Sequence, residues 1–261
     1  LFNLDILGRI ANVVGTFLSI LLLKTNPSWM WASLSVAAII SSLFMINMPS
    51  DFKLGDSVKT KTVLLKIHFK KISTPIYLIF ASSLFFVIES GVRNLVAQPY
   101  ILELKVDEYF LAYFGMTLSV SRLLGILFYK KFLKRFNKMV EFSVVSLLLF
   151  SVAEFVAYKT TNYLIFVSFY SLAIFAIGWY FPIRDIYINS LLEDETRATM
   201  LSFDSFVNKL FSAVVCFGIG FANSNMSLNK YWLIGACSLI LTGMFLHFSY
   251  TAHKKENSTN Y

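Results

Sequence analysis

The fold of this chain is decided by a short charged stretch between two long apolar runs, Tyr187-Ile188-Asn189-Ser190-Leu191-Leu192-Glu193-Asp194-Glu195-Thr196-Arg197-Ala198-Thr199-Met200-Leu201-Ser202. One apolar run precedes it, from Tyr163 to Phe181, and another continues to Ala222. Thr196 and the acidic residues indicate a helix start, because a hydroxyl caps free backbone N–H groups and carboxylates suit the positive end of a helix. At about 1.5 Å per residue, each run is long enough to cross about 30 Å of hydrocarbon. The stretch therefore predicts a turn between two transmembrane helices.

The composition points to the same class of protein. Of the 261 residues, 57% are hydrophobic and 15% are charged, whereas a soluble domain carries about 25% charged residues. Most of the surface must therefore face something other than water, which predicts an all-α integral membrane protein. The net charge of +8 is unevenly distributed along the chain, so it does not indicate nucleic-acid binding. Cys216 and Cys237 lie in apolar runs and are expected to pack there rather than to form a disulfide or bind a metal.

Apolar stretches of about twenty residues predict eight transmembrane helices. They cover residues 6–23, 29–48, 76–97, 108–129, 139–158, 163–187, 202–222 and 231–250. The connections on one side, 49–75, 130–138 and 188–201, together with the tail 251–261, hold fourteen Lys and Arg residues. The connections on the other side hold four. Because positive charge accumulates in cytoplasmic loops, the lysine-rich side and the C-terminus are predicted to be cytoplasmic.

The decisive stretch also carries a resemblance to a known family. Pro182, Arg184 and Asp185, followed by the triplet Arg197-Ala198-Thr199 and the step Leu201-Ser202, resemble the cytoplasmic turn between the tenth and eleventh helices of bacterial major facilitator superfamily transporters. The alternative is an ordinary charged loop of a multi-span protein.

A second local match lies between the fourth and fifth predicted spans. Gly125 and Lys130 resemble the first glycine and the cation of the family's loop signature G-x-x-x-D-R-x-G-R-K. Tyr129 stands where the family has an acid, and Leu133 replaces the second glycine. These departures favour a plain positively charged anchor over a charge-relay loop.

The resemblance implies a domain organisation. Residues 1–48 would be the last two helices of an N-terminal bundle, and residues 49–75 a cytoplasmic linker with a basic amphipathic segment. Residues 76–250 would form the complete six-helix C-terminal bundle, and 251–261 a cytoplasmic tail. On this interpretation the chain is a fragment that corresponds to the fifth to twelfth helices of the family's fold.

The resemblance also implies a function. The expectation is a secondary active transporter of the bacterial plasma membrane, which exports a small amphipathic solute by alternating access, with the proton as candidate coupling ion. Its partners would be the lipid bilayer and the solute, without nucleic acid. The sequence has no G-x-x-x-x-G-K-[ST], H-E-x-x-H or G-x-S-x-G pattern, so we expect no ATPase or other enzyme, no cofactor and no metal. The alternative is a membrane-embedded enzyme or a non-transporting interaction subunit.

Ionisable residues within predicted spans need an explanation, because each costs at least about 2.5–3.5 kcal/mol in the middle of a membrane. Glu89 lies four residues before Arg93, so it is either half of an ion pair or a protonatable carboxylate facing a cavity. Arg122 either extends towards the cytoplasmic surface or contacts a substrate, and the first interpretation is favoured. Glu154 lies near the outer end of its span, where a headgroup-level anchor is favoured over a proton carrier.

The span 202–222 carries a polar stripe that is expected to face the bundle interior or an aqueous path. The stripe consists of Ser205, Asn208, Lys209, Ser212, Cys216, Gly220 and Asn223. Tight helix packing explains its small residues but not Lys209. At the cytoplasmic end, Arg184, Asp185 and Arg197 are candidates for a gate of ion pairs. The alternative is a group of solvated interface charges.

Overall fold

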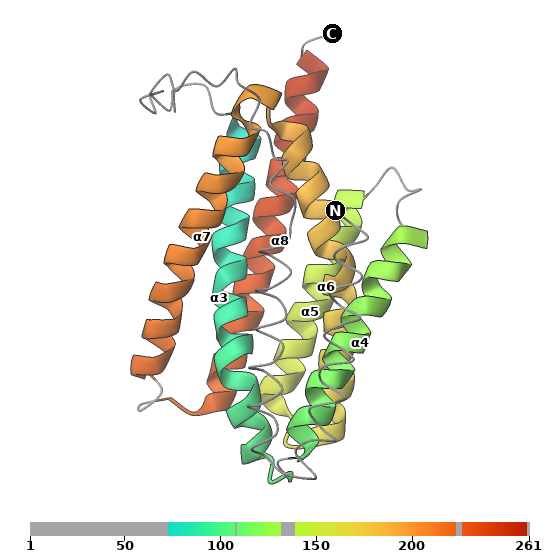
Figure 1. The fold of residues 1–261 in the computed structure, drawn as a ribbon, viewed down its shortest axis with the longest axis vertical. Coiled ribbons are helices and arrows are strands. Elements are labelled where there is room, and N and C mark those ends of the chain that lie inside the picture. The colour runs from blue at the N-terminus through green and yellow to red at the C-terminus, as the bar shows by residue number, and fades with distance from the viewer. Residues whose placement is uncertain (1–72, 108, 132–138, 223–225, 260–261) are drawn as a thin grey trace, which may run out of the picture.

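A computed structural model describes residues 73–107, 109–131, 139–222 and 226–259, and every regular element in these ranges is an α-helix (Figure 1). The helices are α3 (Thr74–Glu103), α4 (Tyr109–Lys131), α5 (Met139–Lys159), α6 (Tyr163–Leu191), α7 (Asp194–Ala222) and α8 (Leu228–Thr259). The predicted spans 6–23 and 29–48, the linker up to residue 72, and residues 132–138 lie outside the described residues. The all-α prediction is confirmed for the described part of the chain.

Among the described residues, five helices are long and apolar enough to cross a membrane. They are α3, α5, α6, the segment Thr196–Ala222 of α7 and the segment Leu228–Glu256 of α8. The 23 residues of α4 span about 34 Å at 1.5 Å per residue, which is also sufficient length. These helices support a multi-pass membrane protein. The count of eight spans and the major facilitator arrangement stay predictions.

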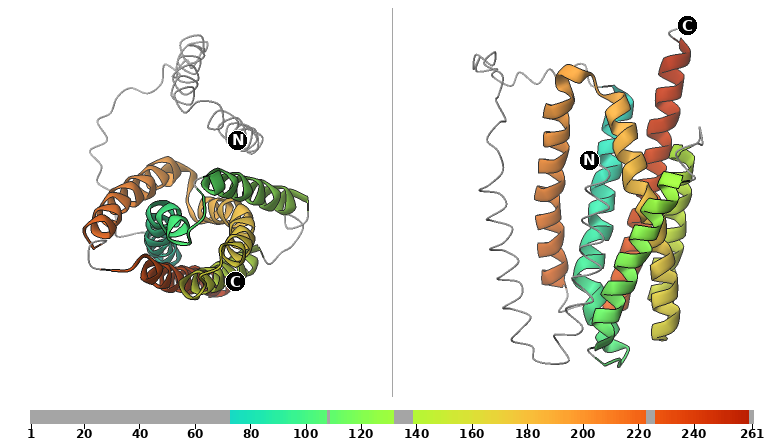
Figure 2. Two further views of the ribbon diagram at one scale, coloured as in Figure 1. Left: turned by 90° about the horizontal axis from the view of Figure 1, so that it is seen from below. Right: turned by 45° about the vertical axis from the view of Figure 1, so that its right-hand side comes forward.

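Consecutive helices run in opposite directions along the bundle (Figure 1). The α6–α7 turn and the C-terminal end of α8 lie at one end, which is the upper end in Figure 1. The C-terminal ends of α3, α5 and α7 and the N-terminal ends of α4, α6 and α8 lie at the lower end. Helix α8 packs against α3 and α5, and α6 packs against α4 and α5. Figure 2 shows α7 at the edge of the bundle, where it packs along its length on α3.

The helices extend beyond the predicted spans, so three predicted connections need correction. Helix α3 continues through part of 98–107 to Glu103, and α8 continues through most of the predicted tail to Thr259. In the predicted turn 188–201, only Leu192 and Glu193 are not helical. The predictions were too short because they were limited to about twenty apolar residues, whereas polar and charged residues continue a helix outside the hydrocarbon.

The predicted cap at Thr196 is also wrong. Helix α7 begins two residues earlier, and the Glu193 carbonyl accepts hydrogen bonds from the backbone N–H of Thr196 at 3.1 Å and of Arg197 at 2.9 Å. The Thr196 hydroxyl donates to the same carbonyl at 3.3 Å. At the start of α6, Asn162 acts as the cap, because its side chain accepts from the N–H groups of Leu164 and Ile165.

Small residues allow the helices to approach closely. A Cβ on Gly178 of α6 would lie 2.8 Å from the Cα of Gly125 in α4, so these two helices cross backbone to backbone. Small polar side chains add hydrogen bonds between helices: Ser82 of α3 donates to the Thr242 carbonyl of α8 at 3.1 Å. Ser151 of α5 donates to a carbonyl of α8 at 3.0 Å. Both are devices by which helices associate inside a membrane, where burial of apolar surface gives little driving force.

Candidate functional site

Two clusters of charged side chains lie inside the bundle among the described residues, and the first is centred on α3 and α5. Arg93 Nε donates to Glu89 Oε1 at 2.8 Å, one helical turn away on α3. Glu89 is fully buried, and its second oxygen has no hydrogen-bond partner among the described residues. Arg93 keeps 18% of its side chain exposed and also donates to Ser90 Oγ at 3.2 Å. The predicted pair therefore forms, with a fully buried carboxylate and an arginine side chain that is partly exposed.

Glu154 of α5 belongs to the same interior. It is fully buried, and neither of its carboxylate oxygens has a hydrogen-bond partner among the described residues. Its Oε2 fills the space that a Cβ on Gly235 of α8 would occupy. The carboxylate interacts electrostatically with Glu89 and Arg93. The favoured expectation of a headgroup-level anchor is therefore wrong, because the side chain points into the bundle, where Gly235 leaves room for it.

Two aromatic residues complete this group, which we call the Glu154 cluster: Glu89, Arg93, Glu154, Tyr170 and Trp232. Tyr170 of α6 and Trp232 of α8 are fully buried, and their ring centroids lie 5.4 Å apart. The Tyr170 hydroxyl and the Trp232 indole N–H have no hydrogen-bond partner in the described ranges. Tyr170 interacts electrostatically with the charged members of the cluster. Buried polar atoms that lack a partner are costly and uncommon, which marks this region as a candidate site.

The second place is the Arg184 cluster, defined by Arg184, Asp204, Ser83 and Asn208. Arg184 Nη2 of α6 lies 2.9 Å from Asp204 Oδ2 of α7, and the same nitrogen donates to the Ser83 hydroxyl of α3. The other oxygen of Asp204 accepts from Asn208 Nδ2 at 3.0 Å. The side chains of Arg184 and Asp204 are 13% and 11% exposed. One guanidinium thus joins three helices near the α6–α7 end of the bundle.

The predicted gate forms only in part: Arg184 and Asp185 form an ion pair, but the shorter ion pair of Arg184 is with Asp204. Arg184 pairs with Asp204 of α7, and its contact with Asp185 is longer, at 3.5 Å, with the Asp185 side chain 64% exposed. Arg197 donates to the Leu192 carbonyl at 3.3 Å, within its own turn. The sequence analysis missed Asp204. An acid within an apolar span, four residues before Asn208, was the signal that could have found it.

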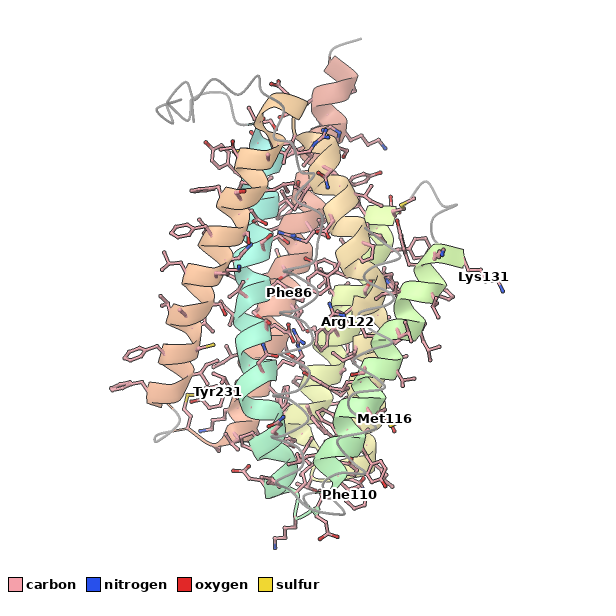
Figure 3. All side chains as sticks on the ribbon, viewed as in Figure 1. Phe86, Phe110, Met116, Arg122, Lys131 and Tyr231 are labelled. Atoms are coloured by element: carbon pink, nitrogen blue, oxygen red, sulfur yellow. The ribbon has the colours of Figure 1, made fainter. Side chains whose placement is uncertain are left out.

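Arg122 of α4 also turns inwards. Its guanidinium carbon lies 5.1 Å from the ring centroid of Phe181 on α6, and its charge interacts with Glu89. Figure 3 shows Arg122 at mid-height of the bundle, well below Lys131 at the end of α4. Nine residues separate them, about 13 Å along the helix axis. The favoured expectation that Arg122 extends to the cytoplasmic surface does not fit this contact.

The loop-signature residues have different surroundings. Gly125 lies at the crossing with Gly178, so its role in the structure is helix packing. Lys130 and Lys131 are exposed in the last turn of α4, where cations suit the negative end of the helix.

The polar stripe of α7 is divided. Asn208, Ser212 and Cys216 are half-buried, whereas Ser205, Lys209 and Gly220 are exposed. Lys209 therefore departs from the expectation of an interior position, the alternative of an aqueous path stays a prediction, and Asn223 lies outside the described residues. At 100° per residue it lies beside the exposed apolar residues Phe206 and Leu210 rather than on the α3-facing side. Cys216 is half-buried, whereas Cys237 is exposed, and both are free thiols.

Comparison with known proteins gives no assignment: no protein-family profile matches the chain, and no match was found among curated proteins or solved structures. The candidate site therefore rests on the geometry of the two charged clusters alone.

Proposed function

We propose that the chain is part of a secondary active transporter of the major facilitator type. It exports a small amphipathic solute, and the energy comes from an ion gradient across the bacterial plasma membrane. The lysine-rich side, with the C-terminus, faces the cytoplasm. The observation that carries this proposal is the partly buried ion pair between Arg184 and Asp204, which joins α6 and α7 and also binds Ser83 of α3.

An ion pair at this position suits alternating access. A transporter needs contacts near each mouth that hold in one state and separate in the other. Arg184 and Asp204 each retain a small exposed fraction, so water can replace the partner when the mouth opens. Within the described residues, helix α7 packs mainly on α3, so few other contacts oppose its displacement from α6.

The interior charges give a second line of support. Glu89, Arg93 and Glu154 lie inside a bundle of apolar helices, where ionisable groups are rare and mark ion or substrate pathways. A static scaffold gains nothing from such groups, because apolar side chains of similar size pack without the desolvation penalty.

One observation favours a different function, that of a non-transporting interaction subunit. The outer face of α7 exposes large apolar side chains, with Phe206 64% and Phe217 77% exposed. Such a face suits lipid, but it equally suits a helix of another protein. Transport activity of the purified protein distinguishes these functions.

The test uses the full-length protein in proteoliposomes with an imposed pH gradient and a fluorescent lipophilic cation as the probe. We expect gradient-dependent accumulation of the probe, abolished by a protonophore. Arg184→Gln should reduce the rate at least tenfold. Lys130→Gln, which removes an exposed cation from α4, should leave it unchanged.

The assay is repeated with cationic, neutral and anionic amphipathic probes. If none of these probes accumulates more than in protein-free vesicles, the result would contradict the proposal. It would favour the interaction subunit instead. Equal rates for Arg184→Gln and the wild type would refute the role assigned to the ion pair.

A further inference from the structure

We infer that Glu154 is a proton-binding site in the interior of the bundle, held as the neutral acid between α5 and Gly235 of α8. The proton adds to one carboxylate oxygen and removes its negative charge, and on release it returns to water. Binding itself does not depend on transport. Only the role of this proton in energy coupling rests on the proposed function.

The geometry around Glu154 supports the neutral form. The side chain is fully buried, and neither oxygen accepts a hydrogen bond from a described residue. A carboxylate in an apolar interior without a cation or hydrogen-bond donors in contact takes up a proton, because desolvation penalises the ionised form much more than the neutral one.

The neighbouring charges do not supply the missing partner. Helix α3 presents Glu89 and Arg93, but the Arg93 guanidinium is hydrogen-bonded to Glu89 at 2.8 Å. Arg122 of α4 acts electrostatically on Glu89 and contacts the ring of Phe181. Glu89 therefore has two cations in its surroundings. Its negative charge makes a second negative charge, on Glu154, unfavourable.

Among the described helices, α6 and α8 make the main contacts with α5. Helix α6 presents the Tyr170 hydroxyl, which has no hydrogen-bond partner among the described residues. Helix α8 presents Gly235 and Trp232, neither of which titrates. A metal ion is a poorer occupant, because the described residues contain no group of three or more ligating side chains. A proton requires one oxygen only.

The route for the proton lies beside Arg93. This side chain keeps 18% of its surface exposed, whereas Glu89, Glu154, Tyr170 and Trp232 are fully buried. Arg93 is therefore the least buried member of the Glu154 cluster. Glu89 is hydrogen-bonded to Arg93, and both residues interact electrostatically with Glu154.

Infrared spectroscopy of the full-length protein in lipid tests the inference without any substrate. A protonated carboxylic acid gives a C=O stretching band separate from the bands of carboxylates and amides. We expect such a band at neutral pH, lost in Glu154→Gln and retained in Glu89→Gln. Glutamine keeps the size of the neutral acid, so the fold should persist. Absence of the band from the wild type, its persistence in Glu154→Gln, or its loss in both variants would overturn the assignment.

A second pair of variants tests the position of the acid. A methyl group at residue 235 would occupy the space of Glu154 Oε2, whereas one at residue 243 of the same helix would lie 3.8 Å from its nearest neighbours, in ordinary contact. We expect Gly235→Ala to shift or abolish the band and Gly243→Ala to leave it unchanged. An unaltered band in Gly235→Ala would refute the packing from which the site is inferred. A positive infrared result together with absent transport would leave the proton site standing and reject the proposed function.

Discussion

Arg184 Nη2 in α6 lies 2.9 Å from Asp204 Oδ2 in α7, and both side chains are almost withdrawn from the surface. Both members of the pair make a further hydrogen bond. The Ser83 hydroxyl of α3 accepts from the Arg184 guanidinium, and Asn208 donates to the second carboxylate oxygen of Asp204. A charge pair with additional hydrogen bonds retains more of its attraction than an isolated one. This contact therefore links α7 to two other helices.

The first prediction concerns the energy of this link. Because removal of one partner leaves a partly buried charge alone, Arg184→Gln and Asp204→Asn should each lower the free energy of unfolding by about 3 kcal/mol. The double variant should lose clearly less than the sum of the two. Chemical unfolding in lipid–detergent micelles measures this difference. Additive losses would show that the two side chains do not interact in the folded protein.

The second prediction concerns the crossing of α4 and α6. A Cβ on Gly178 would lie 2.6 Å from the Arg122 carbonyl oxygen, whereas a Cβ on Gly220 of α7 would meet nothing within 4 Å. Gly178→Ala should therefore destabilise the protein by about 1–3 kcal/mol, since the backbones must separate. Gly220→Ala should be neutral or slightly stabilising, because alanine favours helix. Equal unfolding curves for both variants would refute the close crossing.

The third prediction concerns orientation in the membrane. Ser258 near the end of α8 and Thr161 between α5 and α6 are both exposed and lie at opposite ends of the bundle (Figure 1). With Cys216 and Cys237 replaced by serine, a membrane-impermeant thiol reagent added to intact cells should label Thr161→Cys but not Ser258→Cys. The reason is the excess of Lys and Arg on the side of the C-terminus. Labelling of Ser258→Cys alone would reverse the orientation, and labelling of both would contradict the alternating topology.

The sequence predicted the helices well but not their ends. Apolar runs located all six described helices, because a span must be continuously apolar wherever it contacts lipid. Residues 188–201 were predicted as a turn because they form a charged stretch between two apolar runs. Outside the hydrocarbon the same residues also suit the terminal turns of helices, and only Leu192 and Glu193 break the helix.

The sequence could not predict which way the charged side chains point. Glu154 lies close enough to the end of α5 to reach the headgroups, and it turns inwards because Gly235 on α8 leaves room. That glycine is distant in sequence, so no local pattern reveals the pairing. Arg184 and Asp204 show the same limitation: both are visible as charges within apolar segments, but their contact depends on how α6 and α7 meet.

The most direct test of proton-coupled export measures the movement of protons rather than the movement of the solute. Proteoliposomes with a trapped pH indicator are loaded with a lipophilic cation and diluted into cation-free buffer of the same pH, with the membrane potential clamped at zero. We predict that efflux of the cation acidifies the lumen through the wild-type protein, and that Glu154→Gln abolishes the acidification. A lumen pH that follows protein-free vesicles, or acidification that Glu154→Gln leaves undiminished, would contradict proton-coupled export through this bundle.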